Sequence, residues 1–495
     1  MTPKEAINVY CEAFAAGDLA VISGLFTDDA VCELPLLDDR LVGRERILRE
    51  VETAVGSLRD IKVTLGPIMA GEDDAFAEGI FESEMIAVAP MVDMTPRRLD
   101  FRFVIIVEMA DGLISRLAEY LDTKPIKPLE RSRVFTVARR SPYWQGVEDA
   151  GVSEFMVYNH MYFPMVFSRT PLEEYTALVE RVTLWDVGCE RQTEIRGPDA
   201  LAFGDYLAAR DLTKMSTGAC RYSFVCDPDG QIICDPVILR PWDDALWLSH
   251  GSTDLTLWAR GIALHSDFDV EVCEPDVAPL QVQGPKAINV LHGITEADLD
   301  DLKVYRCVVT RVAGVDAVVS RTGWSGGAGY EIYPLTSERA MELWNALIEA
   351  GRPHGMLVTG PNINRAVERG VTDTSYATNS DMNPLEAGGE HLIDLDGDDF
   401  IGRDALLRVR EAGPSRHTVG LLMDGVLPRL EWNWPVTAAG GRTGVVRWAA
   451  HSFALGRSVA SALVDVNIEI GETVQVDHPL GVVEATVTTL PFVDS

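Results

Sequence analysis

The stretch RTGWSGGAGYEIY, residues 321–333, combines a glycine-rich turn with the start of a strand. It places Trp324 and Glu331 seven positions apart across the turn, and Tyr333 two positions after Glu331 on the same strand face. A buried carboxylate can accept paired hydrogen bonds from the aminopyrimidine edge of a pterin, and glycines let the backbone approach a flat ring. Taken alone, the segment favours a hairpin with an exposed glutamate and core aromatics, and a pterin site becomes the better interpretation only together with the flanking motifs.

Two segments on the N-terminal side of this stretch share a strand–Gly-Pro–helix pattern. They are EIRGPDALAFGDYL at 194–207 and LQVQGPKAINVL at 280–291, in which a strand ends at Gly197 or Gly284 and a proline opens the helix. Their 87-residue separation predicts a duplicated α+β unit. From Thr418 onward, short strands alternate with glycine-rich turns, which predicts a small β-barrel.

The first part of the chain has a different pattern. Apolar residues at three- and four-residue spacing predict helices at 3–16, 18–26 and 44–55, and runs rich in β-formers follow them. Helices followed by a meander of strands predict an α+β layer with helices on one face of an antiparallel sheet. No histidine precedes His160, so acid–base catalysis in this part would depend on carboxylates, tyrosine or lysine.

The segment DTKPIKPLERSR at 122–133 carries two prolines and several basic residues, as is typical of a linker. We predict an α+β fold class with an N-terminal α+β domain at 1–125 and a linker at 126–138. A two-part α+β domain at 139–410 and a β-barrel subdomain at 411–495 follow it.

The composition excludes several classes of function. The chain has 495 residues with 43 Lys+Arg and 76 Asp+Glu, a net charge of −33, which argues against nucleic-acid binding and against an anionic membrane surface. No apolar run approaches the roughly 20 residues that cross a bilayer, and the N-terminus lacks a signal-peptide pattern. Eight cysteines without a CxxC pair predict neither disulfides nor a metal site. We predict a cytoplasmic protein without a metal.

The chain resembles the glycine-cleavage T-protein superfamily, and within it the branch of dimethylsulfoniopropionate demethylase. The resemblance covers about residues 140–495 and is carried by EFMVYNHMYFPMVF, LWDVGCERQTEIRGPDA, ACRYSFVCDPDGQIICDPVIL, CEPDVAPLQVQGPK, SRTGWSGGAGYEIY, NPLEAGGEHL and DFIGRDAL. It implies a three-subdomain ring that holds tetrahydrofolate and transfers one carbon, in this branch a methyl group, from a small methylated substrate to N5. The N-terminal part, with FTDDAVCEL and LVGRERIL, resembles NTF2-like (SnoaL-like) cone domains. Such domains often pair through their sheets, so a homodimer is expected.

The resemblance implies roles for individual residues. Glu331 would grip the pterin, Tyr333 would lie in the folate site, and Trp324 would face the one-carbon centre. Tyr158, in VYNHM, inherits a substrate-binding role, and Tyr222, in CRYS, is a second candidate or a core residue. Three aromatic faces suit a sulfonium or quaternary ammonium, since a desolvated cation gains roughly 0.5–2 kcal/mol per face.

Two departures from the family pattern bear on the chemistry. Aminomethyl-transferring relatives have Asp-Asp where this chain has Cys234 and Asp235, which disfavours aminomethyl transfer. Asp235 could hold a cationic substrate or cap a strand end. Val-Val-Asn of those relatives is replaced by Leu248, Ser249 and His250. A histidine there could protonate a leaving methoxy oxygen, whereas a sulfonium leaves as a neutral thioether without help, and His250 could equally be structural.

The predicted function is tetrahydrofolate-dependent demethylation, with methyl transfer from sulfur, oxygen or nitrogen giving 5-methyltetrahydrofolate. Asp235 and His250 are the candidate catalytic residues. The alternatives are a glycine-cleavage aminomethyltransferase and, in another class, a non-catalytic folate or methylated-solute binding protein. The sequence leaves open the methyl donor, and whether Arg365 or Arg369 contacts a ligand.

Overall fold

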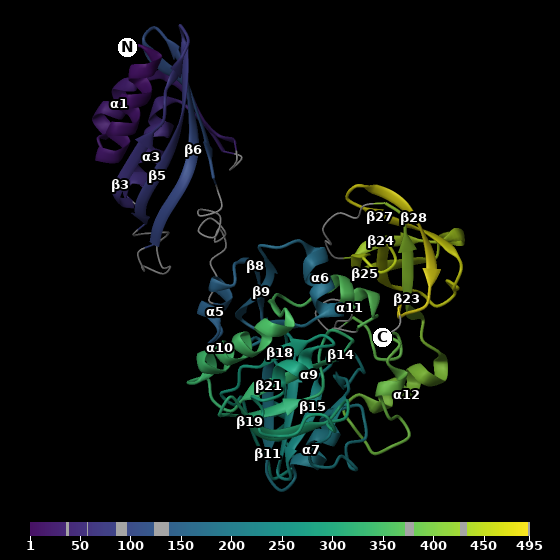
Figure 1. Cartoon of the computed structure of the whole chain (residues 1–495). Helices are drawn as coiled ribbons and strands as arrows, with labels where there is room; N and C mark the ends of the chain where they lie inside the picture. Colours follow the sequence, from purple (N-terminus) through teal and green to yellow (C-terminus); the bar gives the residue numbers. More distant parts are fainter. Residues whose placement is uncertain are drawn as a thin grey trace. The chain divides into compact units, whose positions relative to one another are not determined.

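The computed structural model describes residues 1–35, 39–56, 58–85, 97–122, 138–371, 381–425 and 433–493. The chain divides into two compact units, Met1–Thr136 and Val137–Ser495 (Figure 1). The linker expected at 126–138 lies outside the described residues except for Ala138, so the four domain bounds stay predictions. Within the described residues, no helix has both the length and the apolar character needed to span a membrane.

The first unit begins with the three helices that its apolar spacing predicts. They are α1 (Pro3–Ala16), α2 (Leu19–Leu25) and α3 (Arg44–Gly56). A capping box starts α1, because the Thr2 hydroxyl accepts from the Glu5 backbone N–H while the Glu5 carboxylate accepts from the Thr2 backbone N–H at 2.9 Å. Gly17, in the left-handed region with φ of 67°, ends the helix.

The strands of the first unit form one curved sheet in the order β2-β1-β7-β6-β5-β3, with β4 beside β5. Helix α1 packs on β3, β5 and β6, so the predicted α+β layer is confirmed (Figure 1). One pairing differs from the expected antiparallel sheet: β1 and β7 are parallel, because the whole α3-to-β6 segment separates them in sequence. The strands are β1 (Phe26–Leu34), β2 (Asp39–Val42), β3 (Leu58–Leu65), β4 (Met69–Ala70), β5 (Asp74–Met85), β6 (Arg97–Ala110) and β7 (Leu113–Leu121).

The second unit contains two larger sheets, each with its own apolar core. One has the strand order β19-β20-β21-β18-β10-β22 and the other β12-β15-β16-β11-β17. Their strands are β10 (Thr183–Asp186), β11 (Arg191–Arg196), β12 (Cys220–Tyr222), β15 (Val237–Trp242), β16 (Ala245–His250), β17 (Glu271–Cys273), β18 (Leu280–Gln283), β19 (Cys307–Val312), β20 (Val315–Ser320), β21 (Gly329–Pro334) and β22 (Leu357–Val358).

The two Gly-Pro motifs occupy matching positions, one in each sheet. Strand β11 ends before Gly197, with φ of 141°, and β18 ends before Gly284, with φ of 124°. A side chain at Gly284 would meet the Arg181 carbonyl at 2.7 Å, so the turn requires glycine. Helix α7 (Ala200–Leu207) or α9 (Ala287–Leu291) then follows, which agrees with the predicted repeated unit.

Other helices and short hairpins complete this part of the second unit. They are α5 (Trp144–Asp149), β8 (Val152–Tyr158), β9 (Met161–Phe167), α6 (Pro171–Glu180), β13 (Val225–Cys226), β14 (Ile232–Cys234), α8 (Leu255–Ala263), α10 (Ala340–Gly351), α11 (Ile363–Glu368) and α12 (Arg403–Ala412).

The chain ends in a closed barrel, β23-β26-β25-β24-β27-β28, drawn in yellow-green to yellow in Figure 1. This confirms the predicted C-terminal barrel. Its strands are β23 (Arg416–Met423), β24 (Trp434–Thr437), β25 (Thr443–Ser452), β26 (Arg457–Asp465), β27 (Thr473–His478) and β28 (Gly481–Thr488).

Candidate active site

A cavity of about 730 Å³ lies in the second unit, with walls from both sheets and from the barrel. Six of the seven side chains singled out from the sequence line it: Tyr158, Tyr222, Asp235, His250, Trp324 and Glu331. The seventh, Tyr333, lies behind the wall with 0% of its surface exposed. Residues from several distant segments therefore meet in one space of the size that small-molecule sites have.

Glu331 lies on β21 between polar partners on the two neighbouring strands. The register pairs it with Gln281 of β18 on one side and Ser320 of β20 on the other. Gln281 Nε2 donates to Glu331 Oε1 at 2.7 Å, and the Tyr333 hydroxyl donates to Oε2 at 3.0 Å. The Thr322 hydroxyl also donates to Oε2. The carboxylate is thus held in one orientation at the cavity wall.

Two opposing effects act on the ionisation of Glu331. Burial raises its pKa above the ordinary value, whereas the hydrogen bonds from Thr322, Tyr333, Ser320 and Gln281 favour the ionised form. A ligand that donates N–H groups to the carboxylate would act in the same direction as these hydrogen bonds. The site is therefore suited to a planar ligand with adjacent N–H donors.

Tyr333 acts on the cavity through its neighbours. Its buried hydroxyl donates to Glu331, and Ser249, which lines the cavity, hydrogen-bonds to the same hydroxyl. Burial raises the pKa of Tyr333 well above its ordinary value, so it stays protonated and can donate. This makes Tyr333 a positioning residue for Glu331.

The glycine-rich turn before β21 leaves room for a buried glutamine. A side chain at Gly329 would lie 2.2 Å from Gln283 Oε1, and one at Gly323 would be equally crowded by the same residue. Gln283 is fully buried and accepts a hydrogen bond from the Ser325 hydroxyl at 2.7 Å. The glycines therefore serve first to admit this internal side chain.

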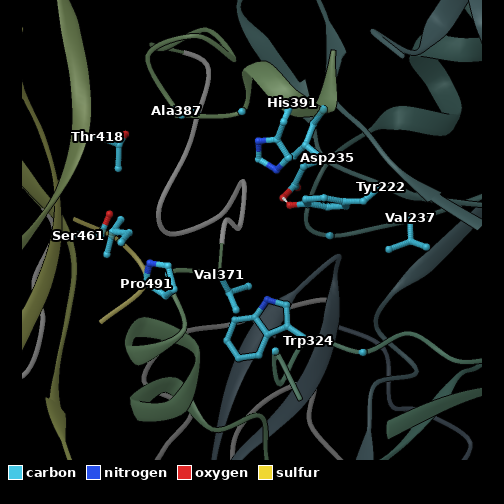
Figure 2. A pocket seen from close by; sticks show the side chains of 18 of the residues that line it. Tyr222, Asp235, Val237, Trp324, Val371, Ala387, His391, Thr418, Ser461 and Pro491 are labelled. Atoms are coloured by element: carbon cyan, nitrogen blue, oxygen red, sulfur yellow. Dashed lines mark hydrogen bonds between the residues drawn. The ribbon is translucent and has the colours of Figure 1, made fainter. Parts of the chain in front are cut away.

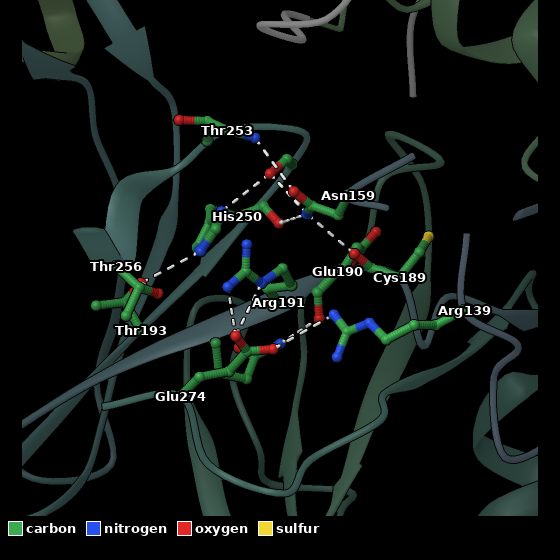
Figure 3. A network of polar contacts seen from close by, with 12 residues as sticks. Arg139, Asn159, Cys189, Glu190, Arg191, Thr193, His250, Thr253, Thr256 and Glu274 are labelled. Atoms are coloured by element: carbon green, nitrogen blue, oxygen red, sulfur yellow. Dashed lines mark hydrogen bonds and ion pairs between the residues drawn. The ribbon is translucent and has the colours of Figure 1, made fainter. Parts of the chain in front are cut away.

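Tyr158 is presented by the tight turn between β8 and β9. Asn159 and His160, with φ of 50° and 60°, form the two-residue connection, a backbone that asparagine tolerates better than most residues. Asn159 Nδ2 donates to the carbonyls of Cys189 at 3.0 Å and Gly251 at 2.8 Å (Figure 3). Asn159 thereby anchors the turn that carries Tyr158 to the cavity.

Tyr222 and Asp235 form a hydrogen-bonded pair in the cavity wall. The Tyr222 hydroxyl donates to Asp235 Oδ2 at 2.6 Å. Figure 2 shows this pair on one side of the cavity, beside His391, with the Trp324 indole below it. The residue before Asp235 is Cys234, which is not acidic and is fully buried in the apolar core.

His250 is buried and hydrogen-bonded at both ring nitrogens (Figure 3). Nδ1 lies 2.9 Å from the Gly251 carbonyl, which can only accept, so Nδ1 carries the proton. Nε2 lies 3.2 Å from the Thr193 hydroxyl. Burial lowers the pKa of His250 to about 4, so the imidazole is neutral near pH 7. This geometry favours a structural role over proton delivery.

Trp324 packs against the C-terminal barrel. Its ring centroid lies 5.5 Å from that of Trp448 on β25, and Trp448 is buried among Ala366, Val367 and Val459. The barrel thus supports an aromatic wall of the cavity from behind.

The two arginines left open by the sequence both bind to the protein itself. Arg365 Nη1 lies 3.4 Å from Oε2 of the fully buried Glu368. Arg369 donates to the carbonyls of Gly326 at 3.0 Å and Val493 at 2.8 Å. Neither is among the described residues that line the cavity.

Several residues of the site were not assigned a role from the sequence, among them Gln281, Ser249 and Asn159. Gln281 carried a visible signal, because alternating glutamines in a buried strand such as LQVQ require hydrogen-bond partners. Ser249 and Asn159 carried none, since their partners are distant in sequence.

Comparison with known proteins gives three family matches. A model described as the GCVT N-terminal domain matches residues 146–397, and one for the glycine cleavage T-protein C-terminal barrel domain matches residues 416–494. A SnoaL-like domain model matches residues 7–117, which confirms the expected type of N-terminal domain.

Individual relatives agree with these matches. Dimethylsulfoniopropionate demethylase DmdA of Ruegeria pomeroyi is 37% identical over 70% of this chain and 96% of its own length. An aminomethyltransferase of Moorella thermoacetica is 34% identical over 65% of this chain and 89% of its own. The crystal structure of glycine cleavage system aminomethyltransferase T from Bartonella henselae shares the fold, with a TM-score of 0.66 and 22% identity over 72% of this chain and 98% of that one.

Proposed function

Because the chain belongs to the glycine-cleavage T-protein family, we propose that it is a demethylase that transfers a methyl group from a small methylated donor to tetrahydrofolate. The products would be the demethylated compound and 5-methyltetrahydrofolate. One observation carries the proposal: a buried acceptor, Glu331, and three aromatic side chains, Tyr158, Tyr222 and Trp324, line the same cavity. The 37% identity to a demethylase supports methyl over aminomethyl transfer.

The residues present fit a reduced pterin. Glu331 offers a carboxylate to adjacent N–H donors, and the donors around it favour its ionised form and fix its orientation. When bound, tetrahydrofolate supplies the N5 lone pair, which forms the new N–CH₃ bond as the electrons of the broken bond leave with the donor's heteroatom and the N5 proton is released. The protein's contribution is to align donor and acceptor and to exclude water.

The surroundings of His250 bear on the type of leaving group. An ether oxygen needs a proton as it leaves, and His250 is neutral, with its single N–H bonded to the Gly251 carbonyl. A sulfonium or quaternary ammonium leaves as a neutral molecule without a proton. The cavity therefore favours S-methyl or N-methyl donors over methoxy compounds.

The test is mass-spectrometric detection of 5-methyltetrahydrofolate after incubation of the full chain with tetrahydrofolate and a panel of S-, N- and O-methyl donors. We expect product with at least one onium donor and a loss of at least tenfold in kcat/KM in Glu331→Gln. Glu349→Gln is the matched control, since Glu349 is exposed and pairs only with Arg352 among its described contacts. Folate binding without product from any donor would contradict the proposal.

The same assay distinguishes the aminomethyltransferase alternative. That reaction would release ammonia and form methylenetetrahydrofolate from an aminomethyl carrier. Position 234 is a cysteine, so this chain lacks the acidic pair of those relatives at Asp235. We therefore expect no methylene product.

We also propose that the first unit pairs with a second copy through its sheet. On β5, Phe76 is 42% exposed and Ile80 41%, and Tyr120 on β7 is 38% exposed. The register places Val104 of β6 beside Tyr120 and Ile106 beside Phe76, so these apolar side chains share the outer face of the sheet. Light scattering should give a dimer mass for the full chain and a monomer mass for Phe76→Arg, and a monomeric native chain would contradict this.

A further inference from the structure

The permanently charged side chains that line the cavity, among the described residues, are of one sign. Among the described residues that line it are three carboxylates, Glu190, Asp235 and Glu331, and neither a lysine nor an arginine. The cavity therefore presents negative charge without a permanent positive charge on its described walls.

Three arginines that adjoin lining residues in sequence or bond to one of them are engaged with protein groups. Arg191 donates to Glu274 at 3.0 Å, and Arg210 donates to the backbone carbonyl of Tyr222 at 2.8 Å (Figure 3 for Arg191). Arg369 bridges the carbonyls of Gly326 and Val493. His391 also lines the cavity and lies beside the Asp235 carboxylate in Figure 2.

Negative charge on the cavity walls favours onium donors without a carboxylate over onium donors that carry one. A desolvated carboxylate needs a cation or several hydrogen-bond donors, and like charges at close range repel. A desolvated onium is stabilised by aromatic faces and by a nearby carboxylate. Tyr158, Tyr222 and Trp324 supply the faces, and Asp235, oriented by the Tyr222 hydroxyl at 2.6 Å, supplies the charge.

We infer that the methyl donor is a small sulfonium or quaternary ammonium cation that carries no carboxylate. This rests on the proposed methyl transfer and narrows its donor. The donor loses one methyl group to N5, keeps the electrons of the broken C–S or C–N bond, and leaves as a neutral thioether or tertiary amine. Asp235 and the aromatic faces lose their electrostatic attraction to it at that point, which assists release.

The experiment compares each zwitterion with its own carboxamide, so that only the negative charge changes. Dimethylsulfoniopropionate and glycine betaine are the zwitterions, and binding to the full chain with tetrahydrofolate is measured by calorimetry in the absence of oxygen. We expect each carboxamide to bind at least tenfold more tightly and to give the higher kcat/KM for 5-methyltetrahydrofolate. Equal or tighter binding of both zwitterions overturns the inference.

Two variants test the role of the acidic group. Asp235→Asn keeps the size of the side chain, and we expect it to weaken binding of the cationic carboxamides at least tenfold and to reduce their advantage over the zwitterions. Asp244→Asn is the control, because Asp244 is exposed and pairs with Arg196 away from the cavity. Unchanged cation binding in Asp235→Asn overturns the inference.

The two readouts separate the failure of this inference from that of the proposed function. Methyl-folate formed from the zwitterions alone overturns the inference and leaves the demethylase proposal intact. Tighter binding of the carboxamides without methyl-folate from any donor supports the ligand class and overturns the demethylase proposal.

Discussion

Replacing Tyr333 by phenylalanine removes one hydroxyl and leaves the ring in its buried position. That hydroxyl donates to Glu331 Oε2 at 3.0 Å. A hydrogen bond to a charged group contributes about 1.5–3 kcal/mol, and one pKa unit corresponds to about 1.4 kcal/mol. Tyr333→Phe therefore raises the already elevated pKa of Glu331 further.

The consequence depends on pH in a defined direction. The ionised carboxylate is the form that accepts pterin N–H groups, so tetrahydrofolate affinity is full above the pKa of Glu331 and falls as pH drops through it. In Tyr333→Phe this fall in affinity begins at a higher pH. The dissociation constant should therefore rise about tenfold on the acid side and change little on the alkaline side.

Calorimetric titration with tetrahydrofolate between about pH 5.5 and 8.5, in the absence of oxygen, measures this shift. Tyr330→Phe is the matched control. Tyr330 directly precedes Glu331 on the same strand, but its side chain belongs to the apolar core beneath the sheet. A change in affinity that is independent of pH, or an equal shift in Tyr330→Phe, would refute the positioning role.

Three further predictions concern stability. Burial raises the pKa of Glu119 from 4.5 to about 7, so the folded form prefers the protonated carboxyl and loses stability as pH rises from 4.5 to 7. In urea unfolding, Glu119→Gln should therefore stabilise the first unit by up to about 3 kcal/mol at pH 8 and by little at pH 4.5. An equal gain at both pH values would contradict this. Trp448→Ala should cost about 3–5 kcal/mol and weaken donor binding, because it removes the support of Trp324; a loss below about 1 kcal/mol would show that the barrel gives no such support. Gly329→Ala should cost about 1–3 kcal/mol in thermal unfolding by crowding the buried Gln283, whereas Gly327→Ala, where the nearest atom is 3.7 Å away, should cost less; equal losses would exclude crowding as the cause.

Local pattern accounted for the elements whose ends are defined by neighbouring residues. Helix α1 begins at a Thr-Pro capping signal and ends at Gly17, and both signals lie within the helix's own segment. The same holds for the Gly-Pro turns after β11 and β18. The parallel pairing of β1 with β7 was missed, because pairing between strands far apart in sequence leaves no local mark.

The candidate site also combines features that the sequence predicted with contacts that only the structure shows. Residue type and motif spacing were sufficient to single out Glu331, Trp324 and the tyrosines, because an acid and aromatics beside a glycine-rich turn are visible in the sequence. The hydrogen-bond partners and burial of these residues are not visible in the sequence. Gln281 reaches Glu331 across 50 positions, and the fully buried Tyr333 contacts the carboxylate instead of the cavity.

The sequence by itself therefore determined the architecture, the family motifs and which residue types are available for chemistry, since these depend on periodicity and composition. Only the tertiary structure decided which side chains are protonated and which partners the charged side chains bind. It buried His250 between Thr193 and the Gly251 carbonyl, so that the imidazole is neutral. It also paired Arg191 with Glu274 and bonded Arg369 to the Gly326 carbonyl. The physical reason is that pKa values, hydrogen-bond partners and local charge depend on desolvation and on contacts between segments that are distant along the chain.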